Sequence, residues 1–295
     1  MRRAPGFGLV LAVTGALILS PDALFMRLSD MGGLQMSGWR GLCMGTVMWL
    51  AWLSISSNRI AELKRLCCRL GAVLIVAQVC NSLFFSLGIA NAPVAIVVMG
   101  VAATPVWAAL LSQFALGEPA GRATWWTIAA VLLGMAIALF GGSAHETDAL
   151  ALDPGVLLGA LFGLGTALVL AANFVTLRAR PDLPLLPAIG TGALIAGCIG
   201  WTATGTTAMM DGMLWAILLT GALILPLSFF LLSQATRYTH AAHVSLIMLL
   251  EAVLSPLWVW WALGEELSPA MLTGAALVIG ALTAFLVTQR PRKKE

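Results

Sequence analysis

The sequence predicts an all-α integral membrane protein with ten transmembrane helices, arranged as two inverted five-helix repeats around a central cavity. Apolar residues make up 60% of the 295-residue chain and charged residues only 10%, against about 45–50% and about 25% in soluble domains. The mean hydropathy of +0.96 agrees with a bilayer environment. The apolar residues also fall into ten segments of roughly the 20-residue length that a spanning helix needs, and a gap-free internal match relates the two halves of the chain.

The ten predicted spans follow one another with short connections. The turn-like tripeptide Asn91-Ala92-Pro93 divides an apolar run that is too long for one span. The first five spans form one predicted repeat over 6–142, and the last five form a second over 154–288. In order, the spans cover residues 6–26, 35–57, 70–90, 93–116, 123–142, 154–177, 185–205, 212–234, 241–263 and 268–288.

The internal repeat is visible in the tetrapeptide ALGE, which occurs at 115–118 and again at 262–265, an offset of 147 residues. At this offset, residues 84–118 and 231–265 share nine identities in 35 positions without a gap. Because each half holds an odd number of spans, the second half must enter the membrane in the opposite orientation. Inverted repeats of this kind are typical of secondary transporters, whose substrate sites lie near the midplane between the halves.

The distribution of basic residues predicts the topology. With the N-terminus inside, 14 of the 16 basic residues fall on the cytoplasmic side, and only Arg27 and Arg40 fall outside. A cleaved signal peptide is the competing interpretation of the basic and apolar N-terminal stretch, but no A-x-A-like cleavage site follows it and its removal would leave nine spans. We therefore expect a multi-pass protein of the cell inner (plasma) membrane with both termini cytoplasmic.

Glu251 lies near the middle of the predicted span 241–263. An ionisable side chain at the bilayer centre costs about 2.5–3.5 kcal/mol on insertion scales, so something must offset it. At 100° per residue, the face that carries Glu251 also carries His240, Ser255 and Trp258. We expect this polar face to line the cavity, where Glu251 would couple protons. The alternative is a protonated glutamate that bonds to a neighbouring helix for packing.

Asp22 and Arg40 fall at similar depths in the outer part of the first and second spans. Opposite charges at one depth favour pairing. Such a pair would act as a gate that breaks during transport or as a fixed brace. A third alternative is that the planar guanidinium of Arg40 binds an anionic substrate.

Other candidate binding residues are amides and tryptophans. Gln78 and Asn81 share one face of the third span, and Asn173 lies in the sixth. These amides would bind a substrate or join neighbouring helices. Trp39, Trp107 and Trp258 lie beside the polar faces, where aromatic rings would hold a quaternary ammonium group or an aromatic substrate, or pack the core.

Several motifs carry a family resemblance. They are Gly117-Glu118 and Gly264-Glu265, the stretch TRYTHAAHVSLIMLLEAVLSPLW at 236–258, and Arg40 within WRG. With them, the chain resembles the drug/metabolite transporter superfamily, specifically proteins with two EamA-like repeats, along essentially all of its length. The resemblance implies ten helices around a central cavity and transport by rocking of the two repeats, with cargoes that range over amino acids, amines, sugars and nucleotide-linked metabolites.

The chain departs from that family at one pair of residues. The fourth and ninth helices of such proteins often carry Glu-Pro, whereas here the first half has Thr104-Pro105 and the second has Glu251-Ala252. Each half therefore keeps one member of the pair, and a single central carboxylate remains.

No sequence motif indicates an enzyme, a metal site or a bound cofactor. The five cysteines lack paired metal-ligand spacing, and there is no Gly-rich phosphate loop, HExxH or Gly-x-Ser-x-Gly. The net charge of +3 is too small to indicate nucleic acid. We expect a secondary active transporter, with export favoured over import, of a small polar or amphipathic metabolite such as an amino acid or related organic ion, by alternating access. Its partners would be that substrate, the bilayer and a proton or counter-substrate, and a homodimer is compatible with the sequence.

Two alternatives to this function stay open. One is a proton-coupled organic-cation or drug exporter that uses Glu251. The other, from a different class, is a non-transporting, membrane-embedded partner subunit. The polar residues at membrane depth favour transport, because a cavity needs them and a scaffold does not.

Overall fold

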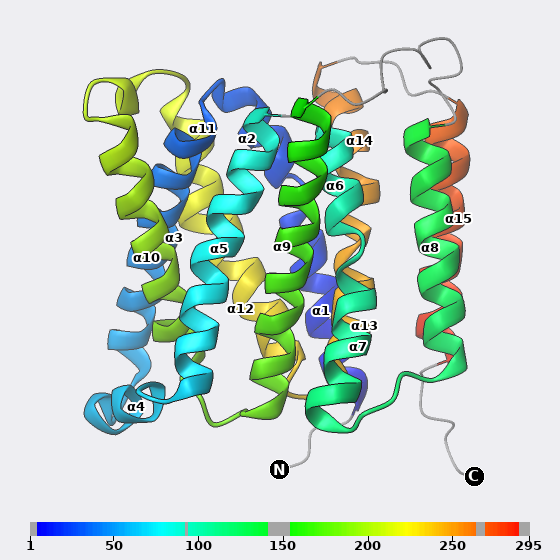
Figure 1. Cartoon of the computed structure of the whole chain (residues 1–295), viewed down its shortest axis with the longest axis horizontal. Coiled ribbons are helices and arrows are strands. Elements are labelled where there is room, and N and C mark those ends of the chain that lie inside the picture. The colour runs from blue at the N-terminus through cyan, green and yellow to red at the C-terminus, as the bar shows by residue number, and fades with distance from the viewer. Residues whose placement is uncertain (1–4, 92–93, 141–153, 264–268, 289–295) are drawn as a thin grey trace.

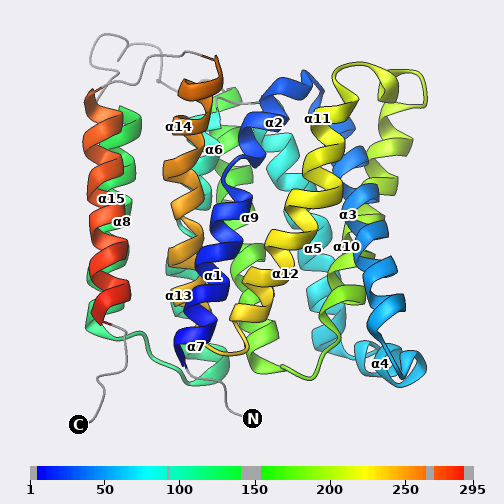
Figure 2. The ribbon, with the colours of Figure 1, turned by 180° about the vertical axis from the view of Figure 1, so that it is seen from behind.

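The computed structural model describes residues 5–91, 94–140, 154–263 and 269–288, which form helices joined by short connections and include no β-strand. The long helices stand side by side in two layers (Figures 1 and 2). The first half consists of α1 (Pro5–Leu19), α2 (Asp22–Ser29), α3 (Gly33–Ile55), α4 (Arg59–Leu66), α5 (Arg69–Asn91), α6 (Val94–Val101), α7 (Thr104–Leu116) and α8 (Arg122–Phe140). The second consists of α9 (Pro154–Ala179), α10 (Leu185–Thr204), the 3-10 helix η1 (Ala208–Met210), α11 (Leu214–Leu219), the π-helical turn η2 (Thr220–Ile224), α12 (Leu225–Ala235), α13 (Ala241–Met248), α14 (Leu250–Leu263) and α15 (Pro269–Thr288).

The prediction of a helical membrane protein is confirmed in its coarse form. Five helical stretches of the described chain are long and apolar enough to cross a bilayer: Gly6–Ser29, Arg69–Asn91, Leu157–Ala179, Leu185–Thr204 and Leu214–Ala235. Thr104–Leu116 and Leu272–Phe285 are apolar but shorter. The count of ten spans and the inverted repeat stay predictions.

Three predicted spans are interrupted rather than continuous. The span 6–26 breaks after Leu19, 93–116 breaks after Val101, and 241–263 breaks after Met248. Prolines explain the first two breaks, because Pro21 and Pro105 have no N–H to donate to the preceding helical turn. No proline stands at the third break. The second and third breaks are nevertheless 147 residues apart, the offset of the sequence repeat.

The helix contacts recur at that same offset. The offset relates α3 to α10, α8 to α15, α5 to α11–α12 and α1–α2 to α9. Correspondingly, α3 packs against α10 and α8 against α15, while α5 packs against α9 and α1 against α12. In the figures α3 runs antiparallel to α10, and α8 runs antiparallel to α15. The contact of α5 with α9 is therefore repeated by the contact of their equivalents, α12 with α1, and the pairs α3–α10 and α8–α15 each join two equivalent helices.

The connections gather basic residues at one end of the bundle. The start of α1 and the end of α15 lie at this end, together with the connections α3–α5, α7–α8, α9–α10 and α12–α13 (Figure 1). Eight basic residues lie in or beside those four connections: Arg59, Lys64, Arg65, Arg69, Arg122, Arg178, Arg180 and Arg237. That this end is cytoplasmic stays a prediction.

Glycines bring α3 and α10 into close contact. A Cβ atom added at Gly41 would lie 2.6 Å from the carbonyl oxygen of Ala193 and 2.6 Å from the amide nitrogen of Gly197. One added at Gly200 would lie 2.4 Å from the carbonyl oxygen of Leu34. Small residues that admit a neighbouring backbone are a common basis of helix association in membranes.

We predict that Gly41→Ala destabilises the protein, because the backbone atoms of α10 cannot move aside as a side chain would. The free energy of unfolding should fall by about 1–3 kcal/mol, the usual cost of overpacking, measured by thermal denaturation in detergent. Gly280→Ala in α15 is the matched control, since a Cβ there meets nothing within 4 Å. Equal melting temperatures for the two variants would contradict the close approach of α3 and α10.

Candidate functional site

A small polar cavity lies between α3, α5 and α12. Its volume is about 50 Å³. That is room for one or two water molecules, at about 30 Å³ each, whereas sites for small ligands measure about 300–1,000 Å³. In this conformation the cavity is therefore too small for a metabolite. Its lining residues are Ser37, Arg40, Gly41, Met44, Gln78, Asn81, Ser82, Phe85, Ser86, Leu225 and Phe229.

Helical spacing explains how α3 and α5 contribute to this wall. On α3 the lining residues follow the pattern i, i+3, i+4, i+7 from Ser37 to Met44, which places them on one face. On α5 the same pattern runs from Gln78 to Phe85. The structure thus brings three of the predicted site residues, Arg40, Gln78 and Asn81, to one cavity.

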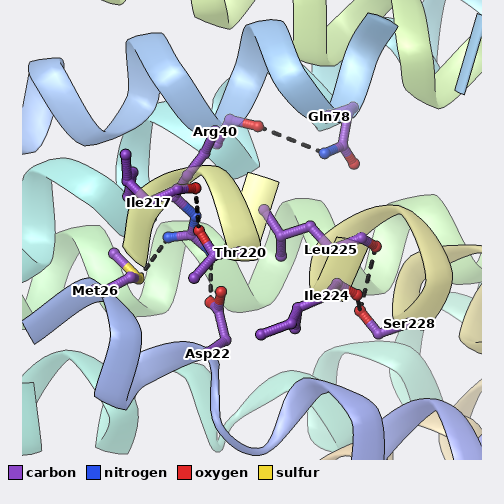
Figure 3. Close-up of polar contacts among 10 residues, drawn as sticks. Asp22, Met26, Arg40, Gln78, Ile217, Thr220, Ile224, Leu225 and Ser228 are labelled. Carbon is purple, nitrogen blue, oxygen red and sulfur yellow. Dashed lines mark hydrogen bonds and ion pairs between the residues drawn. The ribbon is translucent and has the colours of Figure 1, made fainter. Parts of the chain in front are cut away.

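Asp22 and Arg40 form a buried ion pair beside the cavity (Figure 3). Nη2 of Arg40 donates to Oδ2 of Asp22 at 2.5 Å, and the two side chains are only 8% and 2% exposed. The other terminal nitrogen, Nη1, donates to the sulfur of Met26, and the guanidinium carbon lies 5.7 Å from the centre of the Phe85 ring. Asp22 is the first residue of α2, where the helix dipole favours a carboxylate.

Each partner of this ion pair keeps one buried polar atom without a hydrogen bond. Within the part of the chain that the structure describes, Oδ1 of Asp22 and Nε of Arg40 have no partner, nor has the hydroxyl of Ser37. Leaving a buried polar atom unsatisfied costs about 1–3 kcal/mol. A molecule that supplied a donor to Asp22 and an acceptor to Arg40 would remove that cost at both atoms.

A π-helical turn faces Arg40 from the second half. In η2, a Cβ atom at Gly221 would lie 3.0 Å from Cα of Arg40, so the turn is in close contact with α3. Pro226 follows the turn, and its missing N–H leaves the helix ladder incomplete. The hydroxyl of Ser228 donates to the carbonyl of Ile224 at 2.7 Å, a bond to the backbone four residues before it (Figure 3).

Glu251 lies near the ion pair. The charges of Asp22 and Arg40 both act on it, and α14, which carries it, packs against α1 and α2. The indole of Trp258 on the same helix donates to the hydroxyl of Ser20 at 2.9 Å. Two carboxylates and one guanidinium therefore share this region. The side chain of Ser255, a further predicted site residue, lies outside the described residues.

Asn173 of α9 contacts Gln78, one of the residues that line the cavity. Its amide nitrogen donates to the side-chain oxygen of Gln78 at 3.3 Å, which joins α9 to α5. Gln78 in turn is 3.5 Å from the hydroxyl of Ser82. From the sequence, these amides have two alternative roles, and this contact is the second of them, the joining of neighbouring helices. It also orients Gln78 at the cavity.

Three other predicted site residues lie elsewhere. His240 does not share the face of Glu251, because it precedes α13 as an exposed N-cap and the helix breaks at Leu249. Trp39 points away from the cavity: its indole donates to the carbonyl of Met209 at 2.7 Å, and its ring lies edge-on to Trp201. Trp107 packs against the main hydrophobic core from α7.

An ionic cluster that sequence reasoning missed joins three helices at the basic end of the bundle. Glu118, just after α7, accepts from Arg178 of α9 at 3.0 Å and lies 2.9 Å from Nδ1 of His240. Partial burial alone would raise the pKa of Glu118, but Arg178 and His240 together lower it. Glu118 is thus ionised at neutral pH and links the two halves of the chain. The one sequence feature that could have pointed to Glu118 is its position in the repeated ALGE motif.

We predict strong coupling between Asp22 and Arg40 in stability. Arg40→Ala leaves a buried carboxylate without its partner and should cost about 3–5 kcal/mol. The double variant Asp22→Asn/Arg40→Ala removes both charges and should unfold at a higher temperature than Arg40→Ala alone. The exposed pair Arg180 and Asp182 is the control, for which the same cycle should give under about 1 kcal/mol. Additive effects at Asp22 and Arg40 would argue against their contact.

Comparisons with known proteins relate both the sequence and the fold to others. Residues 6–140 match the family model described as "EamA-like transporter family". No curated protein matches the chain by sequence. Among solved structures, one titled "Crystal structure of protein" covers 97% of this chain and 100% of its own length, with a TM-score of 0.78 and 18% identity. At that identity the likeness concerns the fold alone, and it extends over nearly the whole chain.

Proposed function

We propose that this chain, which matches the EamA-like transporter family over residues 6–140, is a secondary active transporter of a small zwitterionic metabolite, with an amino acid as the first candidate. The match of residues 6–140 to this family supports a membrane transporter of the drug/metabolite type. The substrate class, the alternating-access mechanism and export as the direction are our proposal.

The unsatisfied atoms of the Asp22–Arg40 pair carry the proposal. A zwitterion has a cationic donor and an anionic acceptor a few ångströms apart, and each partner of the pair has one unsatisfied buried atom, a carboxylate oxygen of Asp22 and a guanidinium nitrogen of Arg40. An ammonium group would satisfy Oδ1 of Asp22, and a carboxylate would satisfy Nε of Arg40. The neutral amides and hydroxyls of α5 would then bond to the rest of the ligand, with Phe85 and Phe229 as apolar walls.

The small volume of the cavity supports a cycle with more than one conformation. A cavity of about 50 Å³ must widen before a metabolite enters. The Glu118 cluster ties the halves together at the basic end, and the repeated helix contacts would let one half move against the other. We infer that α5 and α12 separate when the site opens, because they supply the facing walls.

Ligand binding should raise the stability of the purified protein, and we expect this effect from amino-acid zwitterions. At a concentration of 100 Kd the gain is about 2.7 kcal/mol, measurable as a shift in melting temperature. The matching methyl ester lacks the carboxylate and the N-acetyl derivative lacks the ammonium group, so both should shift it far less. Equal shifts from the zwitterion and its two derivatives would refute recognition by the ion pair.

Variants of the pair give the corresponding test in transport. In proteoliposome counterflow, Asp22→Asn and Arg40→Lys should each lower uptake of the stabilising amino acid by tenfold or more, about 1.4 kcal/mol. Asp182→Asn, which changes an exposed carboxylate, is the control and should transport normally. Release from preloaded vesicles, sorted by protein orientation, reports the direction.

A second candidate function is proton-coupled export of an organic cation. Glu251 favours it, because two carboxyl groups near one guanidinium would carry an excess negative charge if both were ionised. A proton would offset that charge in the empty carrier, and a cationic substrate would offset it in the loaded one. The two binding events would then exclude each other, which is the condition for exchange.

For this second candidate, we predict that Glu251→Gln separates exchange from accumulation. The variant should still exchange labelled for unlabelled substrate, yet it should lose uptake driven by a pH gradient, because the amide cannot carry the proton. Asp30→Asn is the control, as Asp30 is exposed and Asn tolerates its left-handed φ of 53°. Gradient-driven uptake that survives in Glu251→Gln would exclude this role.

A further inference from the structure

We propose that α4 and its flanking residues bind the headgroups of anionic phospholipids at the membrane surface. The residues involved, here called the α4 surface, are Ile55, Arg59, Ile60, Lys64, Arg65 and Arg69, and all six are exposed. The inference concerns lipids rather than the transported molecule, and it is independent of the proposed substrate.

The position of α4 suits a lipid contact. The helix lies at the basic end of the bundle, between α3 and α5 and outside the five candidate spans (Figures 1 and 2). In the last turns of α3, the rings of Trp49 and Trp52 meet edge to face at 5.1 Å. Tryptophans collect at the level of the lipid headgroups. The α4 surface follows directly after this pair in the chain, and so lies at the boundary of the bilayer.

Specific contacts hold α4 in a fixed orientation. Asn58 caps the helix by accepting from the amide of Ala61 at 3.3 Å, and the indole of Trp52 donates to Glu62 at 2.5 Å. Leu66 is buried in the main hydrophobic core. Arg59 donates to the carbonyl of Leu53 in α3 at 2.6 Å, and the basic residues of the α4 surface stay exposed.

The acidic side chains near α4 already form hydrogen bonds within the protein. Glu62 accepts from Trp52, and Asp182 forms two hydrogen bonds of 2.9 Å with Arg180, which lower its pKa to about 2. Among the described residues, Lys64 and Arg69 form no ion pair. The four basic residues of the α4 surface with Arg180, against Glu62 and Asp182, leave a charge of +3, as large as the net charge of the whole chain.

Exposed apolar side chains distinguish a lipid from a soluble anion. Ile55 is 75% exposed and Ile60 is 71% exposed; Ile60 follows Arg59 directly, and Ile55 lies four residues before it. A free phosphate or an acidic peptide gains little from them, whereas an interfacial helix places such side chains among the acyl chains and its cations among the headgroups. The combination therefore fits a negatively charged lipid.

Lipid titration followed by native mass spectrometry of the full chain tests the proposal. Phosphatidylglycerol should bind more tightly than phosphatidylcholine with the same acyl chains, and inorganic phosphate should not compete. Each basic residue near a membrane surface contributes about fivefold in affinity. Lys64→Gln/Arg69→Gln should therefore weaken phosphatidylglycerol binding about thirtyfold. Lys64→Arg/Arg69→Lys keeps the charge and should bind as the wild type does.

Arg122→Gln is the matched control, because Arg122 is exposed at the start of α8 and lies outside the α4 surface. It should leave phosphatidylglycerol binding within about twofold of the wild type, while Ile60→Ser should weaken it. Should the double variant fail to fold, Lys64→Gln alone should show about a fivefold loss. Equal binding of the two lipids, competition by phosphate, or an equal loss in Arg122→Gln would each overturn the proposal.

Discussion

The need to neutralise charge inside an apolar bundle is the constraint on which this structure depends. Lipid offers no partner to Asp22 or Arg40, so each must find its counterion within the protein. Helix breaks contribute to the solution. Asp22 and Glu251 each lie in the first turn of a helix that starts after an interruption, where unpaired backbone N–H groups favour negative charge. The same local arrangement, a helix start after an interruption, therefore stabilises Asp22 in the first half of the chain and Glu251 in the second.

The two halves share a plan but differ at the site. Helix contacts and two helix breaks recur at an offset of 147 residues. Against this regularity, the π-helical turn η2 has no equivalent in α5, which is continuous from Arg69 to Asn91. Pro226 is the local cause, and Gly221 lets the turn approach Arg40. The second half therefore supplies an adaptable helix opposite the charged residue of the first, which a symmetric repeat would not give.

Depth and helical spacing made part of this site predictable from the sequence. Asp22 and Arg40 fall at the same depth, and Gln78 and Asn81 fall on the same face, so depth and spacing pointed to these contacts even though the helix that carries Asp22 breaks after Leu19. The break at Leu249 could not be foreseen, because no proline marks it within a continuous apolar run. That break removed His240 from the face of Glu251. Trp39 is one residue from Arg40 and therefore about 100° away around the helix. The Glu118 cluster joins residues up to 122 positions apart, beyond the reach of any local pattern.

The glycine contact between α3 and α10 has a mechanical consequence. Helices whose backbones touch through Gly41, Gly197 and Gly200 cannot slide past each other without collision. They would keep their mutual geometry throughout any conformational cycle and act as a stationary frame. The backbone could bend most readily at the segments with discontinuities, namely α1–α2, α6–α7, α11–α12 and α13–α14. Interrupted helices would then mark the segments that move, and the glycines of the α3–α10 contact would mark the segment that stays fixed.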